Sequence, residues 1–132
     1  MQKIDKLAWV CLKNKKALFV RSKNKSLFYN PGGKREGQET DAAALIREIK
    51  EEVSVDLIPE SLRYVNTFTA QADSKPEGTM VELKCYSADY LGELTPASEI
   101  EELGWLTSID MEKTSASGKL TLQWLKQEQL ID

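Results

Sequence analysis

The stretch from residue 31 to residue 54 constrains the fold more than any other part of the chain. It begins with Pro31-Gly32-Gly33, where proline fixes φ and the glycines permit positive φ, so regular structure must break there. The polar residues 39–41 then offer helix-starting chemistry ahead of an apolar run rich in alanine. We therefore expect a glycine-rich loop that leads into a helix, with the helix running to about Val53 and stopping near Ser54.

Short segments with strand-like composition surround this helix. They are residues 7–12, 17–20, 62–70, 80–90 and 103–106. The polar tetrad between the first two segments suits a hairpin loop, and residues 26–29 form a further short extended piece. Residues 73–78 are expected to be the loop between the two longer strands.

Small residues lead into an expected terminal helix. Ser115-Ala116-Ser117-Gly118 forms the link, and Leu120, Trp124 and Leu125 can share one face of the helix behind it. The chain shows no repeat and no internal linker, so we expect one domain over residues 1–132. Its class is α/β, with mostly antiparallel strands and helices packed on the sheet.

The composition excludes several kinds of chemistry. The 132 residues include no histidine, which removes every Ser-His-Asp or Cys-His triad and every imidazole metal ligand. The 18 Lys plus Arg against 21 Asp plus Glu give a net charge of −3, without the electrostatic footprint of a general DNA or RNA binder. Any reaction must therefore use carboxylates, lysines, hydroxyls or a metal ion held by oxygen.

The cysteines and the apolar runs bear on the cellular location. Cys11 and Cys85 lie far apart in apolar stretches and make neither a metal knuckle nor a disulfide framework. We read both as small core residues, with a pairing between them left open. The first residues hold no apolar run long enough for a signal peptide, and no stretch approaches the roughly 20 apolar residues of a membrane helix. The expected location is the cytoplasm.

Glu48, Glu51 and Glu52 form the densest run of acid, and they lie on the first expected helix. At about 100° per residue, Glu51 projects about 60° to one side of Glu48 and Glu52 about 40° to the other. Glu48 and Glu52 border the apolar stripe of the helix, whereas Glu51 lies nearly opposite that stripe. Three like charges on one turn repel each other, and a hard divalent cation would relieve the repulsion. A solvated charged face of the helix is the alternative.

The residues around these glutamates form a longer pattern. Its fixed positions are, in order, Gly33, Glu39, Arg47, Glu48, Ile49, Glu51, Glu52 and Val55. The spacing resembles the Nudix hydrolase signature G-x5-E-x7-R-E-U-x-E-E-x-G-U, in which U is a bulky aliphatic residue. Every specified position of this box, residues 33–55, matches except the last glycine, which is Ser54 here. The Pro-Gly-Gly loop before the box also resembles the loop of that family.

The resemblance implies a role for each matched position. The implied metal ligands are the Gly32 carbonyl, Glu48, Glu51 and Glu52. The implied catalytic residues of the box are Arg47, Glu51 and Glu52, and Glu39 and Arg47 also match positions that brace the loop and the helix. The candidates for holding substrate phosphates are Gly33, Lys34 and Arg21. A surface salt bridge is the alternative role for Arg21.

MutT-like members of the family use a further acidic residue from a distant loop, placed ahead of a tryptophan. Glu99 stands six residues before Trp105 and is a candidate metal ligand and catalytic general base. Glu102 is the alternative carboxylate, and a solvated acidic loop is the other interpretation of this segment. Which carboxylate accepts the proton stays open at this point.

The resemblance further implies the Nudix fold, a mixed, mostly antiparallel sheet sandwiched between helices, and a hydrolase that depends on Mg²⁺, with Mn²⁺ possible. The implied substrate is a nucleoside diphosphate linked to another group, such as a (deoxy)nucleoside triphosphate cleaved to monophosphate and diphosphate. The alternatives are ADP-ribose, a nucleotide sugar, capped RNA, or a nucleotide-binding domain without turnover. The proline that marks the ADP-ribose type is replaced by Gln71. The expected partner is a small nucleotide, with no DNA and no membrane, and a homodimer is left open.

Overall fold

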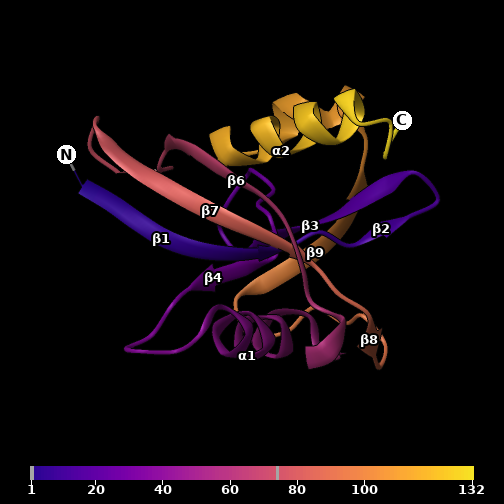
Figure 1. The fold of residues 1–132 in the computed structure, drawn as a ribbon. Coiled ribbons are helices and arrows are strands. Elements are labelled where there is room, and N and C mark those ends of the chain that lie inside the picture. The colour runs from indigo at the N-terminus through magenta and orange to yellow at the C-terminus, as the bar shows by residue number, and fades with distance from the viewer. Residues whose placement is uncertain (1, 74) are drawn as a thin grey trace.

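The computed structural model describes residues 2–73 and 75–132, and its sheets lie between two helices (Figure 1). One sheet has the strand order β4 (Gly32–Lys34), β1 (Gln2–Trp9), β7 (Thr79–Ser87), β6 (Arg63–Gln71). A second has the order β2 (Leu12–Lys13), β3 (Lys16–Ser22), β9 (Ile100–Leu106). A third pairs β5 (Asp56–Leu57) with β8 (Tyr90–Leu91). Only β1 and β7 run parallel among the strands of the described residues, which confirms the predicted mixed, mostly antiparallel α/β class.

The first helix, α1 (Asp41–Val53), has the predicted bounds because both of its ends are set locally. The Thr40 side chain caps the first turn by accepting a hydrogen bond from the Ala43 backbone N–H at 3.1 Å. At the other end, Ser54 adopts a left-handed conformation with φ of 68°. The family signature has glycine at this position, and Ser54 ends the helix at the same point.

The second helix, α2 (Ala116–Gln127), begins earlier than the sequence suggested. Ser115 caps it by accepting a hydrogen bond from the Gly118 N–H at 3.2 Å, so the small residues form the first turn and not a link. Leu122 and Leu125 are fully buried, whereas Leu120 and Trp124 are half-buried. The predicted apolar face therefore omitted Leu122. Two short 3-10 helices, η1 (Pro59–Ser61) and η2 (Ser108–Lys113), complete the described helices.

The predicted strand over residues 7–12 is wrong in its bounds. It is divided, because β1 ends at Trp9 and the hairpin lies between β2 and β3, with positive φ at both Asn14 and Lys15. The strand predicted over residues 80–90 is likewise divided into β7 and β8, and β9 begins three residues before its predicted start. Ladder hydrogen bonds join backbones whatever the side chains, so polar residues extend strands beyond their apolar runs.

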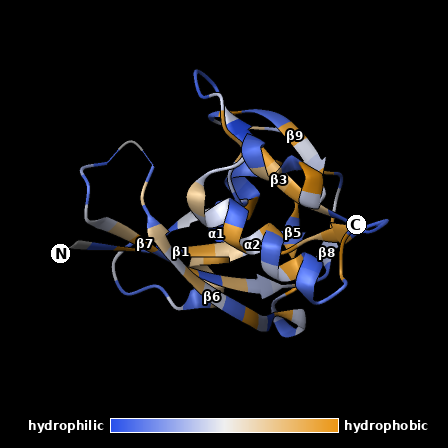
Figure 2. Ribbon diagram, turned by 90° about the horizontal axis from the view of Figure 1, so that it is seen from above, coloured by the Kyte–Doolittle hydropathy of each residue, from blue (hydrophilic) through white to orange (hydrophobic). Residues whose placement is uncertain are grey.

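Apolar side chains of neighbouring β1 residues point to opposite sides of the sheet. Leu7 and Trp9 pack in the cluster beside α1, whereas Ala8 packs in the cluster that includes the α2 leucines. Figure 2 shows hydrophobic residues on the strands and hydrophilic ones on the outer loops. Cys11 and Cys85 belong to different clusters and are buried and free, which confirms both as core residues. No helix in the described residues is long and apolar enough to cross a membrane.

Candidate active site

Glu52 is a carboxylate that α1 turns toward the core. It is only 7% exposed, and its Oε1 accepts a hydrogen bond from the Gly32 backbone N–H at 2.9 Å. Burial raises the pKa of Glu52 to about 8, and repulsion by Glu48 and Glu99 adds to the shift. A buried carboxylate of this kind favours either a proton or a nearby cation.

The two glycines of the loop let backbone approach these carboxylates. Gly32 has a φ of 140°, and a Cβ there would overlap the Leu7 carbonyl oxygen. A Cβ at Gly33 would overlap the carboxylate of Glu48. Glu48 is largely enclosed, with a side chain 16% exposed, and burial raises its pKa while Arg47 opposes the shift. Any larger residue at Gly33 must therefore displace Glu48.

Arg47 joins the loop to the helix. Its Nε and Nη2 each donate to a Glu39 oxygen at 2.8 Å, and Nη2 also donates to the Lys34 carbonyl at 3.1 Å. Its Nη1 donates to Glu48 at 2.8 Å. The Arg47 hydrogen bonds hold the pKa of Glu39 down at about 2. One guanidinium thus fixes the loop and orients a carboxylate of the helix.

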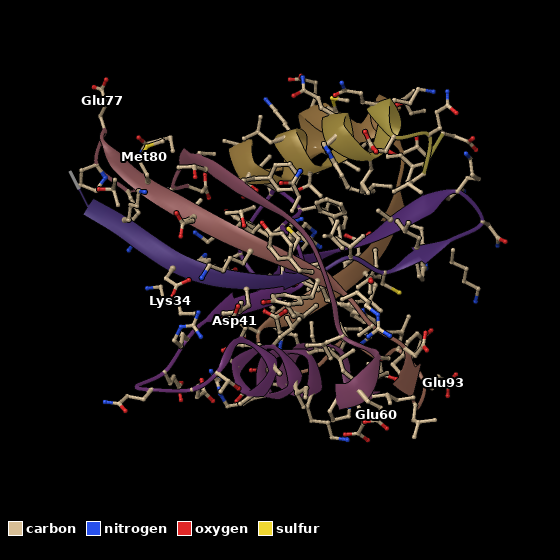
Figure 3. The ribbon with its side chains drawn as sticks, in the orientation of Figure 1. Lys34, Asp41, Glu60, Glu77, Met80 and Glu93 are labelled. Carbon is tan, nitrogen blue, oxygen red and sulfur yellow. The ribbon has the colours of Figure 1, made fainter. Side chains whose placement is uncertain are left out.

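The start of α1 is tied to the sheet by Asp41. Arg35 donates to Asp41 at 2.7 Å and to Asp5 of β1 at 2.9 Å, and the Tyr86 hydroxyl of β7 donates to Asp41 at 2.5 Å. Figure 3 shows Lys34 and Asp41 in the region between the sheet and α1. These contacts fix the orientation of the helix that carries the glutamates.

A cavity of about 340 Å³ opens beside the glycine loop, and it brings distant residues together. Its carboxylates include Glu48, Glu52 and Glu99, and its lysines are Lys6, Lys25, Lys34 and Lys75. Apolar residues form part of the wall: Ile4, Leu7, Val20, Val81, Leu83 and Ile100. The cavity therefore combines oxygen donors, positive charges and an apolar surface.

Glu51, Arg21 and Arg47 are predicted site residues that do not line the cavity. Glu51 has a side chain 54% exposed beside Arg47, and it does not line the cavity. The guanidinium of Arg21 donates to Glu101 at 3.0 Å and to Glu102 at 2.9 Å, again outside the cavity lining. Arg21 therefore makes the surface salt bridge that the sequence left as an alternative. Glu102 is held in this contact, whereas Glu99 of the same segment lines the cavity.

The sequence reasoning missed Lys6 and Lys25. Lys6 lies on β1 directly opposite Lys34 of β4, and both line the cavity. Burial is the largest cause that lowers the pKa of Lys6, followed by repulsion from Lys34. A lysine between Ile4 and Ala8 in an alternating strand was the signal in the sequence.

The donor set bears on whether this site fits a metal ion. Among the described residues, no three carboxylates stand close enough together to form a ready metal cluster. Glu48, Glu52 and Glu99 nevertheless share one cavity, and Glu99 and Glu48 each raise the pKa of Glu52. Carboxylate oxygens are the ligands that hard divalent ions prefer. The residues therefore fit a divalent cation, which would relieve both the burial cost and the repulsion.

Comparison with known proteins identifies the family. A family model described as the NUDIX domain matches residues 4–125. The chain belongs to the Nudix family. The MutT protein from Methanosarcina mazei Go1 is similar in structure, with a TM-score of 0.78 and 15% identity over 97% of this chain and 96% of that one. The MutT NUDIX hydrolase from Burkholderia pseudomallei has a TM-score of 0.73 and 19% identity over 93% of this chain and 98% of that one.

A third similar structure carries a different activity in its name. It is the bifunctional NMN adenylyltransferase/ADP ribose pyrophosphatase from Francisella tularensis, complexed with AMP and a Mn ion. Its TM-score is 0.69, with 23% identity over 96% of this chain and 42% of that one. At these identities the likeness shows the fold, and no curated protein matches the chain. As a Nudix domain the chain is a pyrophosphohydrolase, of a family that uses a divalent metal ion and acts on small nucleotides.

Proposed function

We propose that this Nudix enzyme uses Mg²⁺ to cleave a (deoxy)nucleoside triphosphate to the nucleoside monophosphate and diphosphate, with residues 1–132 acting as one domain. The observation that carries the proposal is the cavity in which Glu48, Glu52 and Glu99 share one space with four lysines. Carboxylates suit a divalent ion, lysines suit a phosphate chain, and the apolar wall suits a nucleobase. Mn²⁺ is the alternative ion.

Each residue of the site has a part in this reaction. Glu48 and Glu52 would hold the metal together with the Gly32 carbonyl and Glu99, and the ion supplies charge neutralisation and an acidified water. Arg47 donates a hydrogen bond to Glu48 at 2.8 Å and would keep that carboxylate oriented. Gly33 lets the backbone lie against the Glu48 carboxylate, and Lys34, the next residue, also lines the cavity and would bind a phosphate.

Glu99 is our candidate for accepting the proton of the attacking water. It lines the cavity, is exposed, and accepts a hydrogen bond only from the neighbouring Ser98 among the described contacts, at 2.6 Å. A general base must lie within hydrogen-bond reach of the proton that it removes, and the position of Glu99 in the cavity supports this role. Glu51 remains a candidate ligand whose carboxylate now lies beside Arg47, at 3.5 Å.

The proposal is tested by measuring diphosphate and phosphate release with Mg²⁺ over a panel of nucleotides, with Glu52→Gln as the inactive control. The panel includes canonical and oxidised triphosphates, ADP-ribose, nucleotide sugars and dinucleoside polyphosphates. We expect diphosphate release from a triphosphate and none from the control. Cleavage of ADP-ribose alone would identify ADP-ribose, and not a triphosphate, as the substrate. The name of the Francisella tularensis structure includes that activity. No turnover of any member would favour a domain that only binds nucleotides.

Glu99 and Glu102 form a matched pair that tests the distal carboxylate. Glu99→Gln removes a charge from the cavity, whereas Glu102→Gln removes one from the ion pair with Arg21. We expect a severe loss of kcat for the first variant and a mild change for the second. The reverse ranking would assign the distal role to Glu102.

A further inference from the structure

Lys6 occupies an inward position of β1 that its neighbours fill with apolar side chains. Side chains on a strand alternate between two faces, so Lys6 shares a face with Ile4 and Ala8. Ala8 is fully buried, and Ile4 packs against the cluster that contains Val81. Lys6 is half-buried and lines the cavity. A charged side chain at such a position needs a compensating partner.

The two strands beside β1 do not supply that partner. On one side, Lys6 stands directly opposite Lys34 in the antiparallel ladder with β4. Directly opposed side chains lie on the same face, and like charges in this arrangement destabilise a sheet. On the other side, Lys6 aligns with the apolar Leu83 of β7. The two neighbouring strands therefore supply no negative charge, and the attraction that acts on Lys6 comes from Glu52 and Glu48 in the cavity, neither of which is joined to it by a salt bridge among the described residues.

The cavity lysines also lack ion pairs. Within residues 2–73 and 75–132, no salt bridge and no side-chain hydrogen bond joins Lys6, Lys25, Lys34 or Lys75 to another residue through the lysine ammonium group. By contrast, Lys3 on the opposite face of β1 pairs with Glu82 at 3.5 Å. Positions that break the pattern of a fold without internal compensation are typical of functional sites. A multiply charged anion in the cavity would supply the missing charge.

We propose that Lys6 is a substrate-binding residue that acts with Lys34 on the phosphate chain and favours substrates with a terminal phosphate. The inference rests on the proposed function in taking that anion to be a nucleotide. A terminal phosphate carries about two negative charges near neutral pH, whereas the linked diphosphate of ADP-ribose has no terminal phosphate. Lysine binds phosphate as a mobile point charge, and two lysines on one face provide for that extra charge. Lys6 thereby selects nucleoside triphosphates over diphosphate-linked compounds.

The test compares Lys6→Met with Lys3→Met, which removes the same charge from the same strand outside the cavity. Steady-state kinetics with Mg²⁺ use a nucleoside triphosphate as substrate and ADP-ribose as substrate or competing inhibitor. For Lys6→Met we expect KM for the triphosphate to rise about tenfold with kcat little changed, since a charged hydrogen bond is lost. We expect the ADP-ribose constant to stay within a factor of about two. Equal losses for both compounds, or none, would overturn the proposal.

A binding measurement separates Lys6 from the proposed reaction. Inorganic triphosphate, titrated by calorimetry without turnover, should bind wild type and Lys3→Met alike and Lys6→Met about tenfold more weakly. Thermal unfolding should place Lys6→Met at or above wild type, because an unpaired, half-buried charge is removed. A lowered melting temperature with unchanged binding would make Lys6 merely structural. If triphosphate binding depends on Lys6 but no nucleotide is hydrolysed, the lysine site is supported and the proposed function is wrong. If nucleotides are hydrolysed equally well with and without Lys6, the proposed function is supported and the role of Lys6 is wrong.

Discussion

The two helices pack on opposite sides of the sheet but bury different chemistry (Figure 1). The buried polar residue of α1 is Glu52, a carboxylate whose pKa burial raises to about 8. That of α2 is Thr121, whose hydroxyl donates to the Ser117 carbonyl at 2.9 Å and accepts from Asn30 at 3.1 Å. The polar group under α2 is thus satisfied by the fold, whereas the Glu52 carboxylate under α1 is buried and repelled by Glu48 and Glu99, with one hydrogen bond from the Gly32 N–H. We infer that α2 serves stability and α1 sacrifices some of it for the site.

Among the variants that test this difference between α1 and α2, Glu52→Gln should change turnover the most. Glutamine keeps the shape and the acceptor for the Gly32 N–H but removes the charge that would bind the metal. We expect kcat/KM to fall by about a thousandfold, a typical loss for a key electrostatic group, while stability stays equal or rises. Nucleotide turnover and urea unfolding of both proteins measure the two effects. Near wild-type turnover would remove Glu52 from the metal site.

The same pair of proteins should differ in the pH dependence of stability in the presence of a chelator. The pKa of Glu52 is about 8 in the folded protein, against the ordinary glutamate value of 4.5 in an unfolded chain. Between these values the folded state binds the extra proton, so the free energy of unfolding falls as pH rises through the window. Below pH 4.5 the effect is absent, and above pH 8 it is complete. Glu52→Gln should lack this decline, and parallel stability curves for the two proteins would contradict the burial argument.

Leu122→Ala tests the opposite side of the comparison. Leu122 is a fully buried residue of α2 and lies outside the cavity lining. Removing its side chain leaves a cavity, and we expect the free energy of unfolding to fall by about 2–5 kcal/mol. Turnover per folded molecule should remain that of wild type. A change in kcat larger than the change in folded fraction would mean that α2 also positions the site.

Gly33→Ala tests the position of the Glu48 carboxylate beside α1 without removing any charge. Its Cβ would overlap the carboxylate of Glu48, so that side chain must move. We expect kcat to fall about tenfold to a hundredfold, since small misplacement of a site group has effects of this size. Gly37→Ala is the control, because nothing lies within 4 Å of its Cβ although φ is +55°. The control should lose stability of about 1 kcal/mol and keep its activity.

The sequence predicted what is determined locally. Helix caps and the direction of helical side chains depend on residues only a few positions apart. The sequence could therefore predict that α1 ends at Val53 and that Glu48 and Glu52 project on a different side from Glu51. Strand ends depend on a partner far along the chain, which is why the polar start of β1 and the division between β7 and β8 were missed. The strand propensity of a residue does not indicate which distant strand it pairs with.

The site residues also divide into those that local sequence could predict and those that depend on distant strands. Gly33 and Glu48 lie close together in the structure, and both belong to the box that the sequence identified. Lys6 enters the cavity only through its register with Lys34, a contact between distant strands that spacing along the chain does not encode. The partner of Arg21 likewise depends on the β3–β9 ladder, where Arg21 stands opposite Glu102. The cytoplasmic location and the homodimer stay predictions.

Ser54 offers the smallest and most selective test, because it ends α1 without belonging to the cavity. Its left-handed conformation costs about 1 kcal/mol in a residue with a Cβ, and its hydroxyl donates to the Thr95 carbonyl at 3.0 Å. Ser54→Gly relieves the conformation and loses the hydrogen bond, so it should unfold close to wild type. Ser54→Ala loses the bond and keeps the conformation, and it should be less stable than Ser54→Gly by about 1 kcal/mol. Both should keep full turnover, because the proposed site lies on the carboxylate and glycine side of α1. Reduced turnover in either variant would extend the site to the end of the helix.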